Sequence, residues 1–444
     1  MAVGPPLELE ELERLVTSGH VDTVLVVWTD PGGRLQGERV HARHFSSQVL
    51  ANGLNLEPGR ADPSAAALSA PSGALVLRPD PGTLRPAPWL AGSVMVQGNL
   101  FRADGLPVRT APRQVLAAQV KEAADLGVVP AGSIALQFSV FDATYAAAAE
   151  RGWTGLPGGA QTGGIGSTNV DEDLLRDLRQ TAYNAGLTVQ SSYGTGVPGQ
   201  HDMSFAPDDL IRAADNQVVF RTAATELAHR HDKALTFMAR YDDRPGNGAR
   251  LSMSLRGLDG SFVFNDTANQ DFSDGRSAVF RSFVAGVLAT LRDFTLLYAP
   301  TVNSYKRFRR DSSAPTAITW GEGGPASALR VAGRGETLRV QNRVPGADVN
   351  PYLALAGMLA GGLYGIRAGL PLEQPLIGDS RAPGLARVPA SLGAARETFA
   401  GSDLARNAFG EDVVATVLRS ADAELDAFES SVTDWERRRG FEMQ

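Results

Sequence analysis

The stretch that decides the fold is LRVQNRVPGADVNPYLALAGMLAGG, residues 338–362. Its first half places two arginines, Arg339 and Arg343, on either side of Gln341. Its second half begins at Asn350-Pro351 and continues in small and apolar residues, which predicts a helix over residues 351–368. A segment with two arginines and a glutamine is therefore followed by an apolar helix, which we expect to be buried in the protein core.

Composition excludes several classes of function. The chain has 444 residues, a formal net charge of −7 and no cysteine. The acidic balance argues against a nucleic-acid partner, and the lack of cysteine excludes disulfides, thiolate metal sites and cysteine nucleophiles. No window reaches about 18 uninterrupted apolar residues, and the first residues show no charged-then-apolar leader. We therefore expect a cytoplasmic protein with no membrane partner, and the Ala-, Gly- and Arg-rich composition suggests a bacterial source.

Hydrophobic patterning predicts an α+β protein with two domains. A strand hairpin around Pro31-Gly32-Gly33 and strands at 74–78 and 92–97 indicate a small β-rich domain over residues 1–108. Residues 109–444 alternate between the two element types. We expect helices at 113–126, 171–185, 208–231, 278–297, 351–368 and 412–428, and strands at 133–141, 187–192, 234–239 and 251–255. The glycine-rich residues 152–168 are either a lid or a surface insertion.

A series of motifs in sequence order resembles the glutamine synthetase family. The matching segments are LRPDPGTLRPAPW (77–89), DGLP (104–107), SSYGTGVPGQH (191–201), LTFM (235–238), NSYKR (303–307), WG (320–321) and NPYL (350–353). VTDWE at 432–436 is similar to the tail of the γ-glutamyl-amine and γ-glutamylpolyamine synthetase branch. The resemblance implies the glutamine synthetase fold, with a β-grasp domain at 1–108 and a large α/β catalytic-type domain at 109–444 around an antiparallel, funnel-shaped sheet. It also implies a ring homo-oligomer of the dodecamer kind, with sites between neighbouring subunits.

The residues that hold divalent metals in this family are replaced here. Family ligases of nitrogen metabolism make a γ-glutamyl phosphate from glutamate and ATP and let ammonia or an amine displace the phosphate, with metals held by five glutamates and one histidine. By resemblance those positions fall on Ala135, Gln137, Thr195, Asp202, Arg250 and Gln341. The formal charge of the set falls from about −5 to about 0, and a guanidinium repels a divalent ion. We therefore expect no metal and no cofactor.

Asp202 and Arg250 have two interpretations. They form a catalytic pair, with Asp202 beside His201 as a general base, or an ion pair that fills the space of the lost metal. Both interpretations remain open at the level of the sequence.

The resemblance also implies residues that bind ligands. Arg307 and Arg343 match arginines that grip the substrate carboxylate, a role suited to the planar guanidinium, although both could instead form structural ion pairs. Gly246, Gln137 and Gln341 complete the expected substrate site. The nucleotide positions that persist are Arg339, Arg330 and Ser254, which matter only if ATP still binds, and Pro325 replaces an arginine of the phosphate-binding element.

Three functions remain open from the sequence. The first is a divergent protein that binds an amino acid or small carboxylate for metal-independent, non-standard chemistry, as in specialised metabolism. The second is an ATP- and Mg²⁺-dependent γ-glutamyl-amine ligase, a carbon–nitrogen ligase, with altered metal ligands. The third is a catalytically inactive regulator or scaffold. The retained arginines favour the first function and an enzyme over a scaffold, while the metal positions argue against standard ligase activity.

Overall fold

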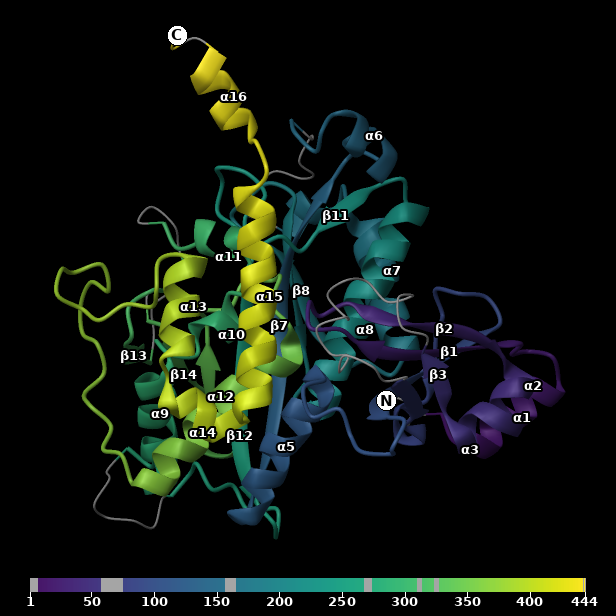
Figure 1. Cartoon of the computed structure of the whole chain (residues 1–444), viewed down its shortest axis with the longest axis horizontal. Helices are drawn as coiled ribbons and strands as arrows, with labels where there is room; N and C mark the ends of the chain where they lie inside the picture. The colour runs from purple at the N-terminus through teal and green to yellow at the C-terminus, as the bar shows by residue number, and fades with distance from the viewer. Residues whose placement is uncertain are drawn as a thin grey trace.

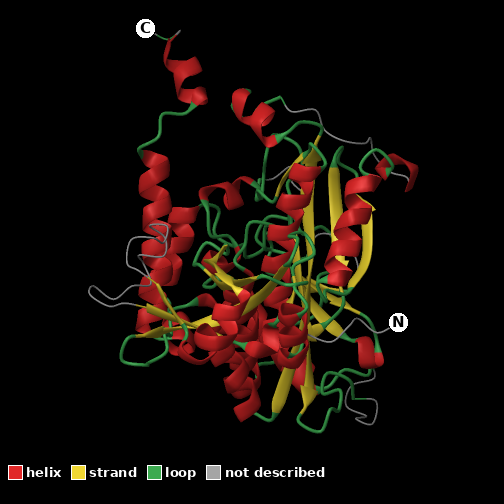
Figure 2. Cartoon of the chain, turned by 90° about the vertical axis from the view of Figure 1, so that its right-hand side faces the viewer, coloured by secondary structure: helices red, strands yellow, loops and turns green. Residues whose placement is uncertain are grey.

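Two β-sheets and the helices around them make up the protein, and the α+β prediction is confirmed (Figures 1 and 2). The computed structural model describes residues 7–56, 75–155, 165–266, 274–309, 314–322, 327–441 and 443. None of the helices in those ranges is long and apolar enough to cross a membrane.

The smaller sheet is built from the N-terminal residues. Its described strands run in the order β2-β1-β6-β4-β3, and β5 pairs with β6. The predicted hairpin is present, because β1 and β2 pair antiparallel around the turn at residues 30–34. The strand bounds are β1 Thr23–Thr29, β2 Leu35–His41, β3 Leu54–Leu56, β4 Leu75–Pro79, β5 Arg85–Pro86 and β6 Ser93–Arg102, and the helix bounds are α1 Leu9–Thr17, α2 Ala42–His44 and α3 Leu50–Asn52.

Strand β1 belongs to two hydrophobic cores. Successive side chains of a strand point to opposite faces of its sheet. Val24 and Val26 lie in a small core with α1, whereas Leu25 and Val27 pack into the large core of the rest of the chain. The small sheet is therefore joined to the remainder of the molecule through one of its faces. The domain boundary at residue 108 stays a prediction.

The larger sheet is centred on one long strand, β7. The described strands follow the order β13-β14-β15-β12-β7-β9-β8, with β10 and β11 also paired to β7. Every recorded pairing is antiparallel except β13 with β14. The bounds are β7 Val128–Phe141, β8 Val189–Gly194, β9 Gln200–Phe205, β10 Asp208–Asp209, β11 Ala234–Thr236, β12 Ala249–Gly257, β13 Trp320–Gly321, β14 Leu329–Ala332 and β15 Arg339–Asn342.

Helices pack against one face of this sheet (Figure 2). We call the opposite face, which carries Gln137, Arg250 and Gln341, the polar face. On β7, Leu136 and Phe138 are buried in the large core, and α5 and α8 pack against the strand. Ala135 and Gln137 alternate with them and point to the opposite face. The helix bounds are α5 Pro112–Asp125, α6 Tyr145–Glu150, α7 Glu172–Asn184, α8 Leu210–Arg230, α9 Ala278–Thr290, α10 Thr295–Tyr298, α11 Val302–Lys306, α12 Pro351–Ala368, α13 Leu392–Ala400, α14 Asp403–Phe409, α15 Glu411–Glu429 and α16 Asp434–Phe441. Helix α16 projects from the body near the C-terminus (Figure 1).

Helix α12 packs closely against α9 because both carry glycine at the contact. A Cβ atom on Gly365 would lie 2.0 Å from the carbonyl oxygen of Ser282, and one on Gly286 would lie 2.2 Å from that of Gly361. Such distances are far below van der Waals contact, so only glycine allows the two backbones to approach this closely. The small residues in the second half of residues 338–362 therefore allow α12 to pack closely against α9.

The start of α12 is tied to the N-terminal sheet. The Asn350 side chain accepts hydrogen bonds from the backbone N–H groups of Tyr352 and Leu353, which caps the helix. Its amide also donates to the carbonyl oxygens of Asp30 and Pro31, at 3.1 and 3.0 Å. One residue thus closes a helix end and holds the β1–β2 turn.

Several predicted elements differ in extent. The helix expected over 278–297 is divided into α9 and α10. Strand β7 begins at Val128, five residues before the prediction, and the short strands β9, β14 and β15 were not predicted. Residues 156–164 of the glycine-rich loop lie outside the described residues, so the choice between lid and insertion stays open.

Asn350→Ala is expected to destabilise the protein by about 1–2 kcal/mol, because it removes a helix cap and two buried hydrogen bonds. Urea unfolding followed by circular dichroism measures the change. Asn407→Ala, at an exposed position of α14, is the matched control and should shift stability by less than about 0.5 kcal/mol. Equal effects of the two substitutions would contradict the role of Asn350.

Candidate substrate site on the polar face of the large sheet

Strand register brings together, on the polar face, most of the positions that the resemblance assigns to metal ligands. Gln137 of β7 lies opposite Asp202 of β9, and Ala135 lies opposite Arg250 of β12. Ser252 of β12 faces Gln341 of β15, which in turn faces Arg330 of β14. Residues far apart in the sequence therefore form one continuous row across four neighbouring strands and β7.

Arg250 and Asp202 form a bidentate ion pair. Arg250 Nη2 donates to Asp202 Oδ1 at 2.8 Å, and Nη1 donates to Oδ2. The Asp202 side chain is fully buried, while 23% of the Arg250 side chain is exposed. Burial opposes the charge on Arg250, but the hydrogen bond and charge of Asp202 raise the pKa of Arg250 overall. The pairing that the sequence suggested is present.

The ion pair crosses the strand between its two partners. Asp202 and Arg250 lie on β9 and β12, the two neighbours of β7. Neighbouring strands are about 4.8 Å apart, so the pair spans about 10 Å, which a long arginine side chain can reach. Ala135 lies opposite Arg250 on β7 and presents only a methyl group. A larger side chain at that position would stand in the path of the guanidinium.

Tyr193 is a third member of this cluster that the sequence reasoning missed. It lies opposite Asp202 in the register of β8 with β9, and it interacts electrostatically with Asp202 and Arg250. Burial and the charge of Asp202 raise the pKa of Tyr193. Its position within the segment between Ser191 and Gln200 was the available signal, because that segment carries a family motif. The hydroxyl extends the polar cluster toward solvent.

The amides and the hydroxyl in the metal set have protein partners. Gln137 Oε1 accepts from the backbone N–H of Gly248 at 2.8 Å. Gln341 Nε2 donates to Ser252 Oγ at 3.1 Å, and Thr195 Oγ1 donates to Gln200 Oε1 at 2.6 Å. Each of these three side chains thus has a hydrogen-bonding partner within the protein.

The donor set does not fit the divalent cation that the fold family implies. Mg²⁺ requires several hard oxygen ligands, usually carboxylates. The single carboxylate at these positions, Asp202, has both oxygens engaged by Arg250. Among the residues that the structure describes, no group of three or more His, Cys, Asp or Glu side chains is placed to hold a metal ion. The guanidinium of Arg250 supplies positive charge at this point of the sheet.

Arg307 is buried behind the loop that follows β15. Its Nη1 donates to the carbonyl oxygen of Val344 at 2.7 Å, and Nη2 donates to that of Arg343 at 3.3 Å. Burial lowers the pKa of Arg307 to about 10. These contacts give Arg307 a structural role in positioning Arg343. Its predicted role as a direct carboxylate ligand remains a prediction.

Arg343 lies among other cations on the polar face. Burial lowers the pKa of Arg343, and the charges of Arg330 and Arg250 lower it further. Arg330 is exposed on β14, and Arg339 donates from Nη1 to the carbonyl oxygen of Thr337. Among the residues that the structure describes on this face, the arginines outnumber the carboxylates, which favours a positive local potential. Such a surface favours an anionic ligand.

The side chain of His201 points away from that of Asp202, so the two do not form the pair that the sequence suggested, and a general-base role for Asp202 stays a prediction. Consecutive residues of β9 point to opposite faces, and His201 Nε2 lies 3.0 Å from Asp171 Oδ2 in the buried interior. Burial alone would raise the pKa of Asp171, but hydrogen bonds from His201 and Lys233 lower it overall. His201 therefore belongs to a buried network behind the sheet.

Three predicted positions remain, namely Gly246, Ser254 and Pro325. A Cβ atom on Gly246 would lie 1.8 Å from the carbonyl oxygen of Ala239, so glycine lets this loop lie directly on the backbone. Ser254 follows Ser252 on the same face of β12, farther from the ion pair. Pro325 lies outside the described residues.

The comparison with family models identifies the chain's ancestry. The model described as glutamine synthetase, catalytic domain, matches residues 109–440. This chain belongs to the glutamine synthetase family. It is also 42% identical over 451 residues to gamma-glutamylethanolamide synthetase GlnA4 of Streptomyces coelicolor, covering 99% of this chain and 96% of that protein. Gamma-glutamylputrescine synthetase PuuA of Escherichia coli is 26% identical over 456 residues, covering 96% and 92%.

Solved structures support the glutamine synthetase fold. Apo GmaS without ligand superposes with a TM-score of 0.86 at 22% sequence identity, covering 98% of this chain and 99% of that one. A structural similarity at 22% sequence identity establishes the fold alone. The predicted resemblance to the amine-ligase branch of the family is confirmed by the sequence relatives.

Arg250→Ala is expected to destabilise the protein by about 3 kcal/mol, because it leaves the Asp202 carboxylate buried without a partner. The double variant Arg250→Ala/Asp202→Ala should recover part of that loss. Chemical denaturation of the three proteins measures the coupling. Arg256→Ala removes an exposed arginine from the same strand and should cost less than about 1 kcal/mol. A loss for Arg250→Ala no larger than for Arg256→Ala would argue against a stabilising ion pair.

Proposed function

We propose that this chain binds a glutamate-like amino acid on the polar face of the large sheet, without a divalent metal, for chemistry that differs from phosphoryl transfer. The observation that carries the proposal is the Arg250–Asp202 ion pair at the positions where relatives of the family hold metal. The ion pair is neutral as a unit, and the neighbouring Arg343 and Arg330 supply the positive charge that an anionic ligand requires. Loss of metal dependence is part of the proposal.

Arg343 is the residue that we assign to the ligand carboxylate. It lies on the polar face, partly exposed, at the end of β15, and Arg330 and Arg250 add to the positive potential around it. Arg307 holds the backbone of Arg343 from behind. A carboxylate accepting two parallel hydrogen bonds from Arg343 would offset the repulsion among the three arginines. Gln137, Gln341 and Tyr193 provide neutral polar groups beside it.

ATP-dependent γ-glutamyl-amine ligation is the second candidate, and the sequence relatives support it better than they support metal-independent chemistry. The specific observation is the 42% identity to gamma-glutamylethanolamide synthetase over 99% of this chain. For this candidate, ATP and Mg²⁺ would be the cofactors, and Arg339, Arg330 and Ser254 would contact the nucleotide. The donor set on the polar face argues against it, because Arg250 engages the carboxylate that a metal would need. No observation in the described structure favours a regulator or scaffold over either candidate.

Assembly and location remain proposals. The extensive match to the family supports a ring homo-oligomer, and the cytoplasmic location stays a prediction.

Arg343→Ala is expected to weaken the binding of L-glutamate at least about tenfold, because it removes a charge-assisted hydrogen-bonding partner. Isothermal titration in buffer with EDTA, and again with Mg²⁺, measures the affinity. The wild-type affinity should be the same in both buffers. Arg381→Ala, which removes an exposed loop arginine, is the matched control and should bind as wild type does. Binding that requires Mg²⁺, or an unchanged affinity in Arg343→Ala, would contradict the proposal.

A further inference from the structure

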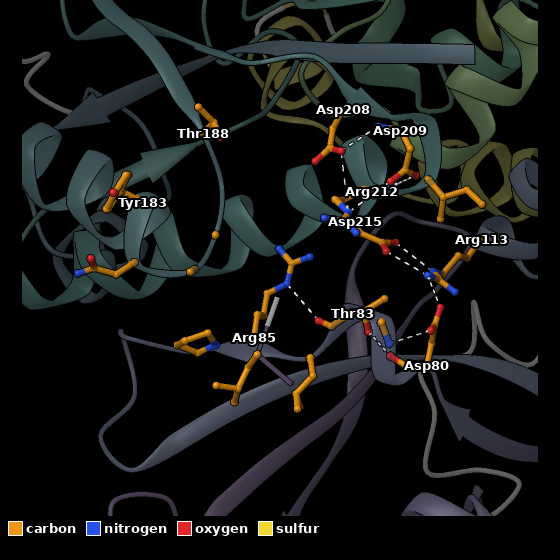
Figure 3. Close-up of a pocket in the computed structure, with 18 residues that line it drawn as sticks. Asp80, Thr83, Arg85, Arg113, Tyr183, Thr188, Asp208, Asp209, Arg212 and Asp215 are labelled. Atoms are coloured by element: carbon orange, nitrogen blue, oxygen red, sulfur yellow. Dashed lines mark hydrogen bonds and ion pairs between the residues drawn. The ribbon is translucent and has the colours of Figure 1, made fainter. Parts of the chain in front are cut away.

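A cavity lies away from the polar face, between the N-terminal sheet and two helices (Figure 3). Its volume is about 800 Å³. One wall comes from residues 80–86, which include β5, and the other from the end of α7 and the start of α8. No residue proposed for the polar-face site lines it.

One side of the cavity is electrically balanced. Arg113 pairs with Asp215 through Nε and Nη2, at 3.1 and 3.2 Å, and Nη2 also donates to Asp80 at 2.8 Å. Tyr352 donates its hydroxyl to Asp215 at 2.6 Å. These groups satisfy one another, so they form a rigid wall rather than a vacant binding point.

Arg85 lacks such a partner. It is 7% exposed, and its guanidinium points into the cavity (Figure 3). Nε donates to the carbonyl oxygen of Thr83 at 3.3 Å, and Nη1 donates to Asn216 Oδ1 at 2.7 Å. Within the described part of the chain, no carboxylate lies within ion-pair distance of Arg85 and no partner is recorded for Nη2. A buried guanidinium without an anion is costly unless a ligand compensates its charge.

Asp208 carries the complementary charge on the other wall. Burial raises the pKa of Asp208. Its nearest recorded cation is Arg212, whose Nε lies 3.9 Å from Asp208 Oδ1 but only 3.3 Å from Asp209 Oδ2. Arg85 interacts electrostatically with Asp215 most strongly and with Asp208 more weakly, but neither carboxylate is in ion-pair contact with it. One wall therefore presents an incompletely paired carboxylate, and the other presents a guanidinium that no carboxylate touches.

We propose that this cavity is a second small-molecule site that takes a zwitterion, an amino acid with its carboxylate on Arg85 and its ammonium on Asp208. A ligand with a single charge would compensate the charge on one wall and leave the charge on the other wall uncompensated. A ligand held at both ends would also connect residues 80–86 to the start of α8. The site is independent of the proposed function, because the two sets of residues do not overlap.

The test uses the Arg343→Ala protein as background, so that binding at the polar face does not contribute. Glycine, β-alanine and 4-aminobutyrate are titrated calorimetrically, with acetate and ethylamine as single-charge probes. At least one zwitterion should bind, and should bind more tightly than either single-charge probe. Arg85→Gln and Asp208→Asn should each weaken that binding about tenfold or more.

The controls carry the same charge changes elsewhere. Arg43→Gln and Asp173→Asn alter exposed residues outside the cavity and should leave the affinity unchanged. Asp208→Asn hardly changes the size of the side chain, so we expect this variant to fold. It therefore tests binding even if Arg85→Gln does not fold. The proposal is overturned if no zwitterion binds below roughly 10 mM, if acetate binds as tightly as the best zwitterion, or if Asp208→Asn leaves the affinity unchanged. Failure of the proposed function would appear separately, in the L-glutamate titrations.

Discussion

The bidentate contact between Arg250 and Asp202 is the interaction on which the polar face depends. It joins the two neighbours of β7 across a position where Ala135 leaves room for the guanidinium. It also occupies both oxygens of the only carboxylate in the replaced metal set. An ion pair of this geometry is stable only while both partners remain, because either charge alone would be buried at considerable cost. Ala135, Asp202 and Arg250 therefore form one consistent arrangement.

Other contacts stabilise the sheets and helices around the polar face. Asn350 caps α12 and binds the β1–β2 turn, while glycines allow α12 and α9 to pack backbone to backbone. None of these contacts involves the replaced positions. The fold, which the chain shares with a 42% identical gamma-glutamylethanolamide synthetase, therefore does not depend on those positions. Function depends on the groups of the site, and the fold alone does not determine it.

Much of the frame was predictable from the sequence, and part of the site was too. Helix α12 has the predicted bounds because Asn350-Pro351 marks its start and small residues continue to Ala368. The Arg250–Asp202 pair followed from the motifs at both positions. Strands β14 and β15 escaped prediction because four residues are too few to show alternation. The burial of Arg307, the contact of Tyr193 and the cavity between Arg85 and Asp208 depend on tertiary packing, which no local pattern encodes.

The most direct test of the central claim is Mg²⁺-dependent ADP formation from ATP in the presence of L-glutamate and ethanolamine. Coupled detection of ADP, with the gamma-glutamylethanolamide synthetase of Streptomyces coelicolor as a positive control, provides the measurement. If the arginine–aspartate pair has replaced the metal site, ADP formation should not exceed the enzyme-free background with or without Mg²⁺. Turnover that is proportional to the protein concentration and abolished by EDTA would contradict the account and establish the ligase.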